Sequence, residues 1–278
     1  MTGKVSNTIW KTFVYVLLSI GAIAMIFPLY WMVVTSLKSD IDVQSSTMSW
    51  WPSAPMWGNY VKTFTALPFG RWTLNTIEIT VLTIVGAVIS NALIAYGFSR
   101  FKVRERSWLF MIVLATMMLP GAVTMIPKFI LFRDLGWLNT YLPLIVPSFF
   151  GSAFFIFLLR QFFMTIPIEL EEAARIDGLG PFAILLRIIL PLTLPALTTL
   201  AIFQFNGAWN DFMGPLIYLS DLKTYTLSLG INFFKGANTT QYNYLMAASV
   251  VSLIPSVVIF FVGQKYFIEG ISLSSGIK

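Results

Sequence analysis

The sequence predicts an all-α polytopic membrane protein with six transmembrane helices. Of its 278 residues, 57% are hydrophobic and only 11% are charged. With a mean hydropathy of +0.78, the chain is far too apolar for a soluble domain. A helix needs about 20 mostly apolar residues to cross a hydrocarbon core about 30 Å thick. Six stretches of 21 to 29 uncharged residues meet this requirement: 12–37, 79–99, 107–127, 135–159, 188–210 and 236–264.

The first stretch, 12–37, is too long for the apolar part of a signal peptide, and no small-residue cleavage site follows it. We therefore expect a retained helix. The long segment after it carries Trp50, Trp51 and Trp57, which are typical of an interfacial aromatic belt. We expect residues 1–72 to form an N-terminal helix and an extracytoplasmic segment, and residues 73–278 to form a core of five transmembrane helices.

Basic residues orient the remaining spans. Arg100, Lys102, Arg104 and Arg106 crowd into the short loop between spans two and three, and positive charge marks a loop as cytoplasmic. Six spans then place both termini in the cytoplasm. Prolines within the spans are expected to kink some helices or end them early. They are Pro28, Pro120, Pro127, Pro143, Pro147, Pro215 and Pro255.

The composition excludes several function classes. The chain has no Cys and no His, so it lacks thiol nucleophiles, imidazole bases and the commonest zinc ligands. We expect no catalytic site and no metal site. The net charge of +6 comes from short basic clusters between apolar runs, a pattern that indicates membrane topology and no nucleic-acid partner.

The segment between spans four and five predicts a short cytoplasmic helix at about 166–178. Pro167 suits the first turn, Glu169 favours the positive end of the helix dipole, Arg175 suits the last turn, and Gly178 can adopt the left-handed conformation that ends a helix. The apolar residues that share one face by spacings of three and four are Ile166, Leu170, Ala173 and Ala174. The two alanines would let another surface approach closely.

A second helix is expected to start at Pro181 and to end before Pro191, leading toward span five. Residues 172–178 read Glu-Ala-Ala-Arg-Ile-Asp-Gly, and Ile188, Leu190, Pro191 and Pro195 follow at fixed spacing. This motif resembles the cytoplasmic signature of permease subunits in binding-protein-dependent ABC importers of bacteria.

The motif departs from that family at two positions. Leu179 stands where the family usually has Ala, and Leu185 stands where it usually has an aromatic residue. Phe182, three positions before Leu185, is able to fill the same space.

The resemblance extends along most of the chain and is strongest to the sugar-importer branch, which contains the smaller permease subunit of the maltose transporter. Further marks of that branch are Asn59-Tyr60, Leu74-Asn75-Thr76, Ala95-Tyr96 with Arg100-Phe101, Leu119-Pro120, Ile126-Pro127, Leu135-Gly136 with Leu138-Asn139-Thr140, Trp209-Asn210-Asp211-Phe212 and the tail 270–278.

The resemblance implies a type I ABC importer permease fold in the bacterial inner membrane and a pathway for a sugar or oligosaccharide. It also implies a second permease subunit, two ATPase subunits and an extracytoplasmic solute-binding protein. The helix at 166–178 would be the coupling helix that docks on an ATPase subunit. The residues implied in this coupling are Glu171, Glu172, Ala173, Ala174, Asp177, Gly178, Leu190 and Pro191.

The sequence also indicates, independently of the resemblance, that any ATP-driven force must come from another subunit. The chain contains no G-x-x-x-x-G-K-[ST] phosphate loop. We therefore expect it to bind no cofactor, with ATP and Mg used by partner subunits.

Four polar residues in or near the spans are candidates for lining a transport pathway: Glu78, Asn206, Asn210 and Asp211. The last three share one face of a helix through their spacing. Alternatives remain open. Glu78 and Asp211 could lie at the outer interface in contact with water, and asparagines often join helices to one another.

A rival from another class is an ion-coupled secondary transporter that acts without an ATPase. Such a protein would use carboxylates buried in the membrane, and only Glu78 and Asp211 qualify, each near the end of a span. A membrane enzyme is a weaker rival, because outside the coupling helix no His, Cys or cluster of carboxylates faces the cytoplasm.

Overall fold

The computed structural model describes residues 2–45, 49–236 and 240–274. Within this part, the regular structure is helical apart from one isolated backbone bridge between Lys235 and Thr240. The end of the tail, residues 275–278, lies outside the described residues. The chain forms two compact units. The first contains residues 1–69 and 231–254, and the second contains residues 70–230 and 255–278. Our division at residue 72 did not assign 231–254 to the first unit.

The first unit is built on the N-terminal helix. Its elements are α1 (Thr2–Ser36), α2 (Asp40–Gln44), α3 (Gly58–Ala66), η4 (Asn232–Phe234) and the first part of α15 (Tyr242–Ser274). The Asn59 side chain donates hydrogen bonds to the carbonyls of Ser36 and Lys38, each at 2.9 Å. These bonds satisfy carbonyls at the end of α1 and fix the start of α3 beside it.

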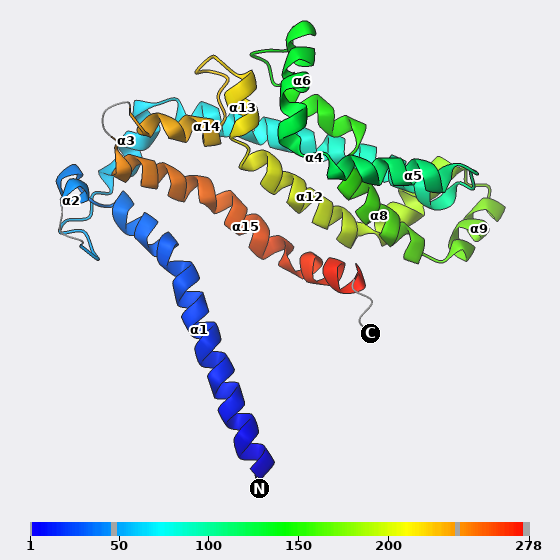
Figure 1. Cartoon of the computed structure of the whole chain (residues 1–278), viewed down its shortest axis with the longest axis horizontal. Helices are drawn as coiled ribbons and strands as arrows, with labels where there is room; N and C mark the ends of the chain where they lie inside the picture. The colour runs from blue at the N-terminus through cyan, green and yellow to red at the C-terminus, as the bar shows by residue number, and fades with distance from the viewer. Residues whose placement is uncertain (1, 46–48, 237–239, 275–278) are drawn as a thin grey trace. The chain divides into compact units, whose positions relative to one another are not determined.

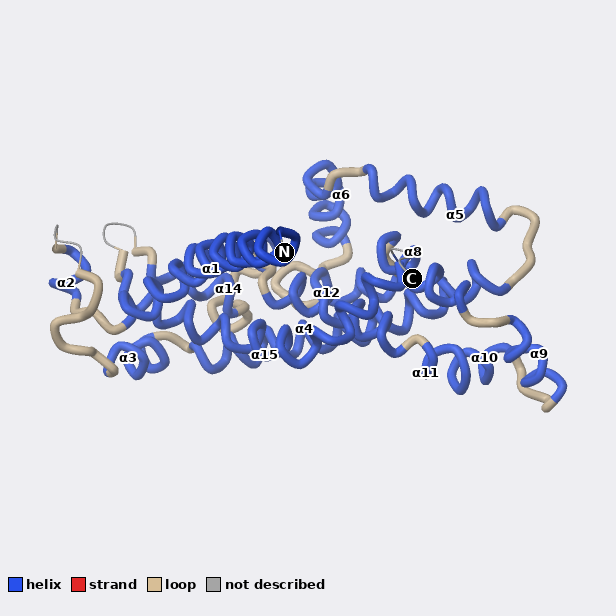
Figure 2. Tube along the Cα trace, turned by 90° about the horizontal axis from the view of Figure 1, so that it is seen from below, coloured by secondary structure: helices blue, strands red, loops and turns tan. Residues whose placement is uncertain are grey.

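The second unit carries the remaining elements. They are α4 (Phe69–Arg100), α5 (Arg106–Ala115), η1 (Thr116–Met118), α6 (Gly121–Asp134), α7 (Leu142–Ile145), η2 (Val146–Phe150), α8 (Ala153–Thr165), α9 (Ile168–Ile176), α10 (Pro181–Ile184), η3 (Leu185–Ile189), α11 (Leu190–Leu192), α12 (Leu194–Trp209), α13 (Met213–Tyr218) and α14 (Leu227–Ile231), which ends at the boundary between the units. Figures 1 and 2 both show α9 at one end of this unit.

The described residues contain four to six candidate membrane spans, compared with the six predicted. Four described helical segments are long and apolar enough to cross a membrane: Trp10–Ser36, Phe69–Arg100, Leu142–Thr165 and Tyr242–Gln264. Two bent pairs of helices bring the total to six if each pair is counted as one span: Arg106–Met118 with Gly121–Asp134, and Pro181–Leu192 with Leu194–Trp209.

The third predicted span, 107–127, is not one continuous helix. The helix that starts at Arg106 stops at Met118, and α6 leaves it at an angle of 96°. Leu119 is extended, with φ −81° and ψ 114°. Its position before Pro120 explains this, because a proline ring disfavours the helical conformation of the residue before it.

The helix after α9 does not end before Pro191 as predicted. It continues through η3, which is a π-helical turn, to Leu192, and the break to α12 comes at Thr193 with a bend of 81°. Pro191 lacks the N–H that an α-helix would bond to the carbonyl of Arg187, and a π turn accommodates such a local mismatch. The Thr193 hydroxyl donates to the Ile189 carbonyl at 2.8 Å and so closes the helix end.

The core of the second unit joins the predicted coupling helix to the spans. Three alanines of α4 are almost fully buried, and their small side chains let neighbouring helices approach closely. The buried members of this cluster are Ala87, Ala92, Ala95, Tyr96, Phe155, Leu159, Phe162, Phe163, Ile166, Ala174, Ile184, Leu185, Ile189, Ala196 and Leu200. Because the cluster includes Ala174 of α9, that helix is part of the packed body.

Candidate functional site

The helix predicted at 166–178 is present as α9. Pro167 is its N-cap, one position before the first turn. Gly178 has φ +84°, the left-handed conformation predicted for it. The N–H of Gly178 bonds the Arg175 carbonyl at 3.0 Å, and the N–H of Leu179 bonds the Ala174 carbonyl at 2.9 Å. These two bonds form a Schellman motif, which ends the helix sharply.

The apolar residues predicted to form one contact face of α9 lie on two sides of the helix. Ala174 is only 5% exposed and faces the core, whereas Leu170 and Ala173 face outward. The buried neighbour of Ala174 is Glu171, three residues earlier and therefore on the same side of the helix. The predicted coupling residues are thus divided between an inner and an outer face.

Glu171 is held inside the second unit by an ion pair with Arg100, the last residue of α4. The Arg100 and Glu171 side chains are 8% and 0% exposed. Arg100 Nη2 also donates to the Ile166 carbonyl at 2.9 Å, just before α9 begins. The Tyr96 hydroxyl lies 3.5 Å from Glu171 Oε2. This arrangement ties the start of α9 to the C-terminal end of α4, and it leaves the Glu171 side chain with no exposed surface.

Sequence analysis did not identify Arg100 as a partner of Glu171. Arg100 was interpreted as one of four loop charges and as part of a family motif, and Glu171 was interpreted as a coupling residue. The one available signal was that Glu171 lies on the same helix face as Ala174.

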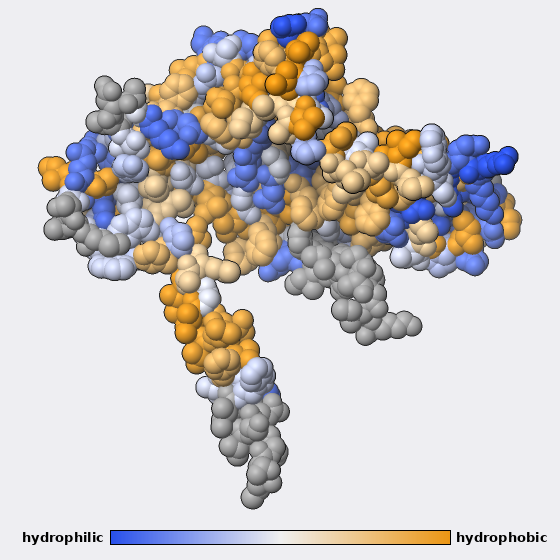
Figure 3. All heavy atoms as spheres, in the orientation of Figure 1, coloured by the Kyte–Doolittle hydropathy of each residue, from blue (hydrophilic) through white to orange (hydrophobic). Residues whose placement is uncertain are grey.

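The docking surface predicted from the sequence would lie on the outer face of this region, and we define it by its exposed apolar residues: Ile168, Leu170, Ala173, Ile176, Phe182 and Leu186. Ile176 is 87% exposed and Phe182 is 63% exposed. Exposed acidic residues Glu169, Glu172 and Asp177 surround them. In Figure 3, the end of the second unit that carries α9 is predominantly hydrophilic with hydrophobic patches. Such a patch with a polar rim is typical of an interaction surface.

The last two predicted coupling residues lie away from the docking surface in sequence. Leu190 is half-buried against the core cluster, and Pro191 is exposed next to the bend at Thr193. Their positions associate them with the geometry of the bend between α11 and α12.

The four predicted pathway residues are not gathered into one site. Asn206 and Asn210 are exposed, and each side chain donates at 3.0 Å to the carbonyl four residues earlier. Glu78 is exposed on α4. Asp211 lies beyond the end of α12 and lines a pocket of about 140 Å³. The other residues around this pocket are Ile79, Thr83, Leu144, Gln204, Gly207, Ala208, Pro215 and Thr226.

Asp211 is the charged group of this pocket. Burial raises the pKa of its carboxyl, while hydrogen bonds from the N–H groups of Gly214 and Met213 oppose that shift. The Gly214 N–H lies 3.0 Å from Oδ1. Thr83, Gln204 and Thr226 supply further hydrogen-bonding groups, which sequence reasoning had not assigned to a pathway. Within the described residues, no group of three or more Asp or Glu side chains is suited to hold a metal ion.

Comparison with known proteins identifies the class. Residues 84–272 match the family of binding-protein-dependent transport system inner membrane components. The chain belongs to this family and is an integral membrane permease subunit of an ABC importer.

Named relatives and a solved structure agree with this assignment. The chain is 31% identical over 269 residues to the arabinooligosaccharides transport system permease protein AraQ of Halalkalibacterium halodurans, covering 94% of this chain and 96% of that protein. It is 32% identical over 267 residues to the sn-glycerol-3-phosphate transport system permease protein UgpE of Pectobacterium atrosepticum, covering 93% and 95%. A crystal structure of a bacterial ABC transporter that imports the acidic polysaccharide alginate superimposes with a TM-score of 0.84 at 28% identity, covering 94% of this chain and 98% of that chain.

Proposed function

We propose that this chain pairs with a second, different permease subunit to form the translocation pathway for a sugar or oligosaccharide delivered by a solute-binding protein. Two separate ATPase subunits would drive transport, since this chain contains no phosphate-binding loop. The basic loop between α4 and α5 supports an orientation with both termini in the cytoplasm. The observation that carries the proposal is the docking surface on a helix held rigidly to the end of a span.

A carbohydrate cargo is supported by the relatives and by the chemistry of the pocket. The names of two similar proteins specify arabinooligosaccharides and alginate, and the third specifies glycerol-3-phosphate. All three solutes carry hydroxyl groups. Asp211, Gln204 and Thr83 offer acceptors and donors for hydroxyl groups. We propose Asp211 as a pathway residue, together with Asn206, Asn210 and Glu78, whose exposed side chains are free to contact solute or a partner.

The outer face of α9 is proposed to dock in a groove of an ATPase subunit. Glu172, Ala173 and Asp177 are exposed on this face. Ala173 is small enough to let the helix approach closely, and helix-in-groove binding is a common mode for such a surface. Gly178 ends α9 sharply, and the chain continues into α10, whose Phe182 also belongs to the docking surface.

The buried face of α9 would transmit the movement of the ATPase subunits to the spans. When ATP closes the ATPase dimer, the docked helix moves with it. Because Glu171 is paired with Arg100, displacement of α9 is passed directly to the end of α4. The spans then switch between inward-facing and outward-facing states. Glu171 and Ala174 therefore serve coupling from inside the subunit, while Leu190 and Pro191 serve it at the bend that leads into α12.

Cysteine cross-linking provides a direct test of docking, because the chain has no native Cys. We expect a reagent with one thiol-reactive end and one photoactivatable end to link the Ala173→Cys variant to the ATPase subunit. The adjacent Ala174→Cys variant is a matched control, because that position is 5% exposed and should not react. Equal cross-linking at both positions, or at neither, would contradict the assignment of the outer face.

Transport assays test the same surface. Glu172→Lys places a positive charge on the docking surface, so we expect uptake to be abolished while membrane insertion is retained. Normal uptake would count against docking. A tagged chain should also bring down an ATPase during purification, whereas an ion-coupled secondary transporter would purify without one.

A further inference from the structure

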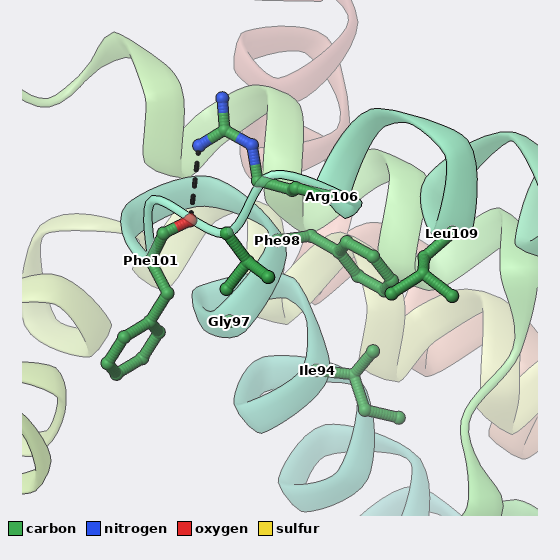
Figure 4. Close-up of a pocket in the computed structure, with 7 residues that line it drawn as sticks. Ile94, Gly97, Phe98, Phe101, Arg106 and Leu109 are labelled. Atoms are coloured by element: carbon green, nitrogen blue, oxygen red, sulfur yellow. Dashed lines mark hydrogen bonds between the residues drawn. The ribbon is translucent and has the colours of Figure 1, made fainter.

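An apolar groove lies between the inner end of α4 and the start of α5, apart from the docking surface and the Asp211 pocket. Its volume is about 250 Å³, and its lining is formed by Ile94, Gly97, Phe98, Phe101, Val103, Arg106 and Leu109. Figure 4 shows Ile94 at one end of this groove and the guanidinium of Arg106 at the other. The groove is therefore apolar along its length with one cation at its end.

Further charge lies beside that end. The loop of residues 101–105 carries Lys102 and Arg104, and its one acidic residue is Glu105. Lys102 and Arg104 are exposed and form no ion pair with any described residue. Arg106 donates through Nη1 to the carbonyls of Ser99 and Phe101, both at a long 3.5 Å. Bonds of this length are weak, so three cations are available to an anionic group.

The groove lies at the ends of two candidate membrane spans. α4 and the helix that begins with α5 both belong to candidate membrane spans, and the groove is formed where the first ends and the second begins. This is the level at which acyl chains meet headgroups. Trp108, which precedes the lining residue Leu109 in sequence, is 63% exposed, and indoles favour this interface. An apolar groove suits the acyl chain of an anionic phospholipid, and cations at headgroup level suit its phosphate.

We propose that this groove binds one anionic phospholipid, with part of an acyl chain along Gly97 and Phe98 and the phosphate on Arg106, Lys102 and Arg104. A zwitterionic lipid offers the same acyl chain but would place its own ammonium group among these cations. The site thus selects for net negative charge. The inference goes beyond the proposed transport function and does not depend on which cargo is carried or on the orientation of the chain.

Two variants test the charge and the shape of the site independently. The triple variant Lys102→Gln/Arg104→Gln/Arg106→Gln removes the cations and leaves the groove. Gly97→Leu fills the groove and leaves the cations, and it is compatible with the fold because a Cβ at Gly97 meets no atom within 4 Å. Leucine also favours a helix more than glycine does. The matched controls are Lys62→Gln/Lys128→Gln/Lys223→Gln for charge, at three exposed positions, and Gly70→Leu for volume, since Gly70 also has open space.

The experiment measures binding of phosphatidylglycerol and phosphatidylcholine with identical acyl chains by native mass spectrometry. It uses the full chain, both alone and with its co-purified partner subunits. For the wild-type chain we expect preferential retention of phosphatidylglycerol. The triple variant should lose about fivefold in affinity for each charge removed. Gly97→Leu should lose about tenfold or more, because it displaces buried methylene groups. Neither control variant should change binding.

Several results would overturn the proposal. Equal retention of the two lipids by the wild-type chain would show that charge plays no part. Unchanged phosphatidylglycerol binding in Gly97→Leu would show that the groove is not the site. Loss of binding when the partner subunits are present, with cross-linking of Gly97→Cys to the second permease, would show that the groove is a subunit interface.

Discussion

Replacing Glu171 with Gln tests whether the Arg100–Glu171 pair holds the coupling helix in place. The substitution keeps the size of the side chain but leaves the charge of Arg100 buried without its counter-ion. Both side chains are at least nine-tenths buried, with exposures of 8% and 0%. Removing one partner of a buried pair costs about 3–5 kcal/mol. Arg175 cannot replace Arg100, because it is 54% exposed and 3.9 Å from Glu171 Oε2.

This decrease in the free energy of unfolding should lower the melting temperature by a measurable amount. For a chain of this size, about 1 kcal/mol lowers the melting temperature by about 2–4 °C, so Glu171→Gln should melt about 6–20 °C below the wild type. Melting of the purified protein in detergent measures this shift. Glu172→Gln is the matched control, because it removes the same charge from an exposed position on the same helix, and its effect should stay within about 0.5 kcal/mol.

A double-mutant cycle measures the interaction energy between Arg100 and Glu171 separately from the contacts that each residue makes with its other neighbours. Arg100→Met alone should be destabilising because it leaves the Glu171 carboxylate buried and unpaired. The double variant Arg100→Met/Glu171→Leu should recover most of the loss, because replacing both partners with apolar residues is often neutral. If Glu171→Gln has the same melting temperature as Glu172→Gln, or if the cycle shows no coupling energy, the ion pair does not hold α9 in place.

Three further predictions concern other parts of the second unit. Gly178→Ala should destabilise the protein by about 1–2 kcal/mol, since φ is +84° there, whereas Gly180→Ala, at φ −75°, should be nearly neutral in the same melting assay. Thr76→Val should cost about 1–3 kcal/mol, because the buried Leu227 N–H loses its bond to the Thr76 hydroxyl oxygen at 2.8 Å; wild-type melting would contradict this. Asp211→Asn should lower solute uptake about tenfold through loss of a charged acceptor, as radiolabelled uptake can measure, and unchanged uptake would remove Asp211 from the pathway.

The sequence alone determined the features that depend on short stretches of chain. Six uncharged stretches predicted six spans because a helix needs a minimum apolar length to cross a bilayer. The helix at 166–178 was predicted from its end signals, and the structure has α9 with Gly178 in the expected conformation. These signals act within one or two turns, so they can be read without knowing the rest of the fold.

Two features near prolines were only partly predictable. Prolines were expected to interrupt spans, but the break after Met118 and the continuation of the helix past Pro191 were not specified. A proline removes one hydrogen bond wherever it stands. Whether the helix then bends, ends or absorbs the defect in a π turn depends on what packs around it.

Only the tertiary structure decided which residues act together. It brought Arg100 to Glu171, separated Ala173 from Ala174, and placed Asp211 with Thr83 and Gln204 while leaving Asn206 outside that pocket. Each of these arrangements depends on how helices distant in sequence pack together. Helical periodicity tells which residues share a face, but it does not tell which face meets which neighbour, because that is set by the simultaneous packing of several helices.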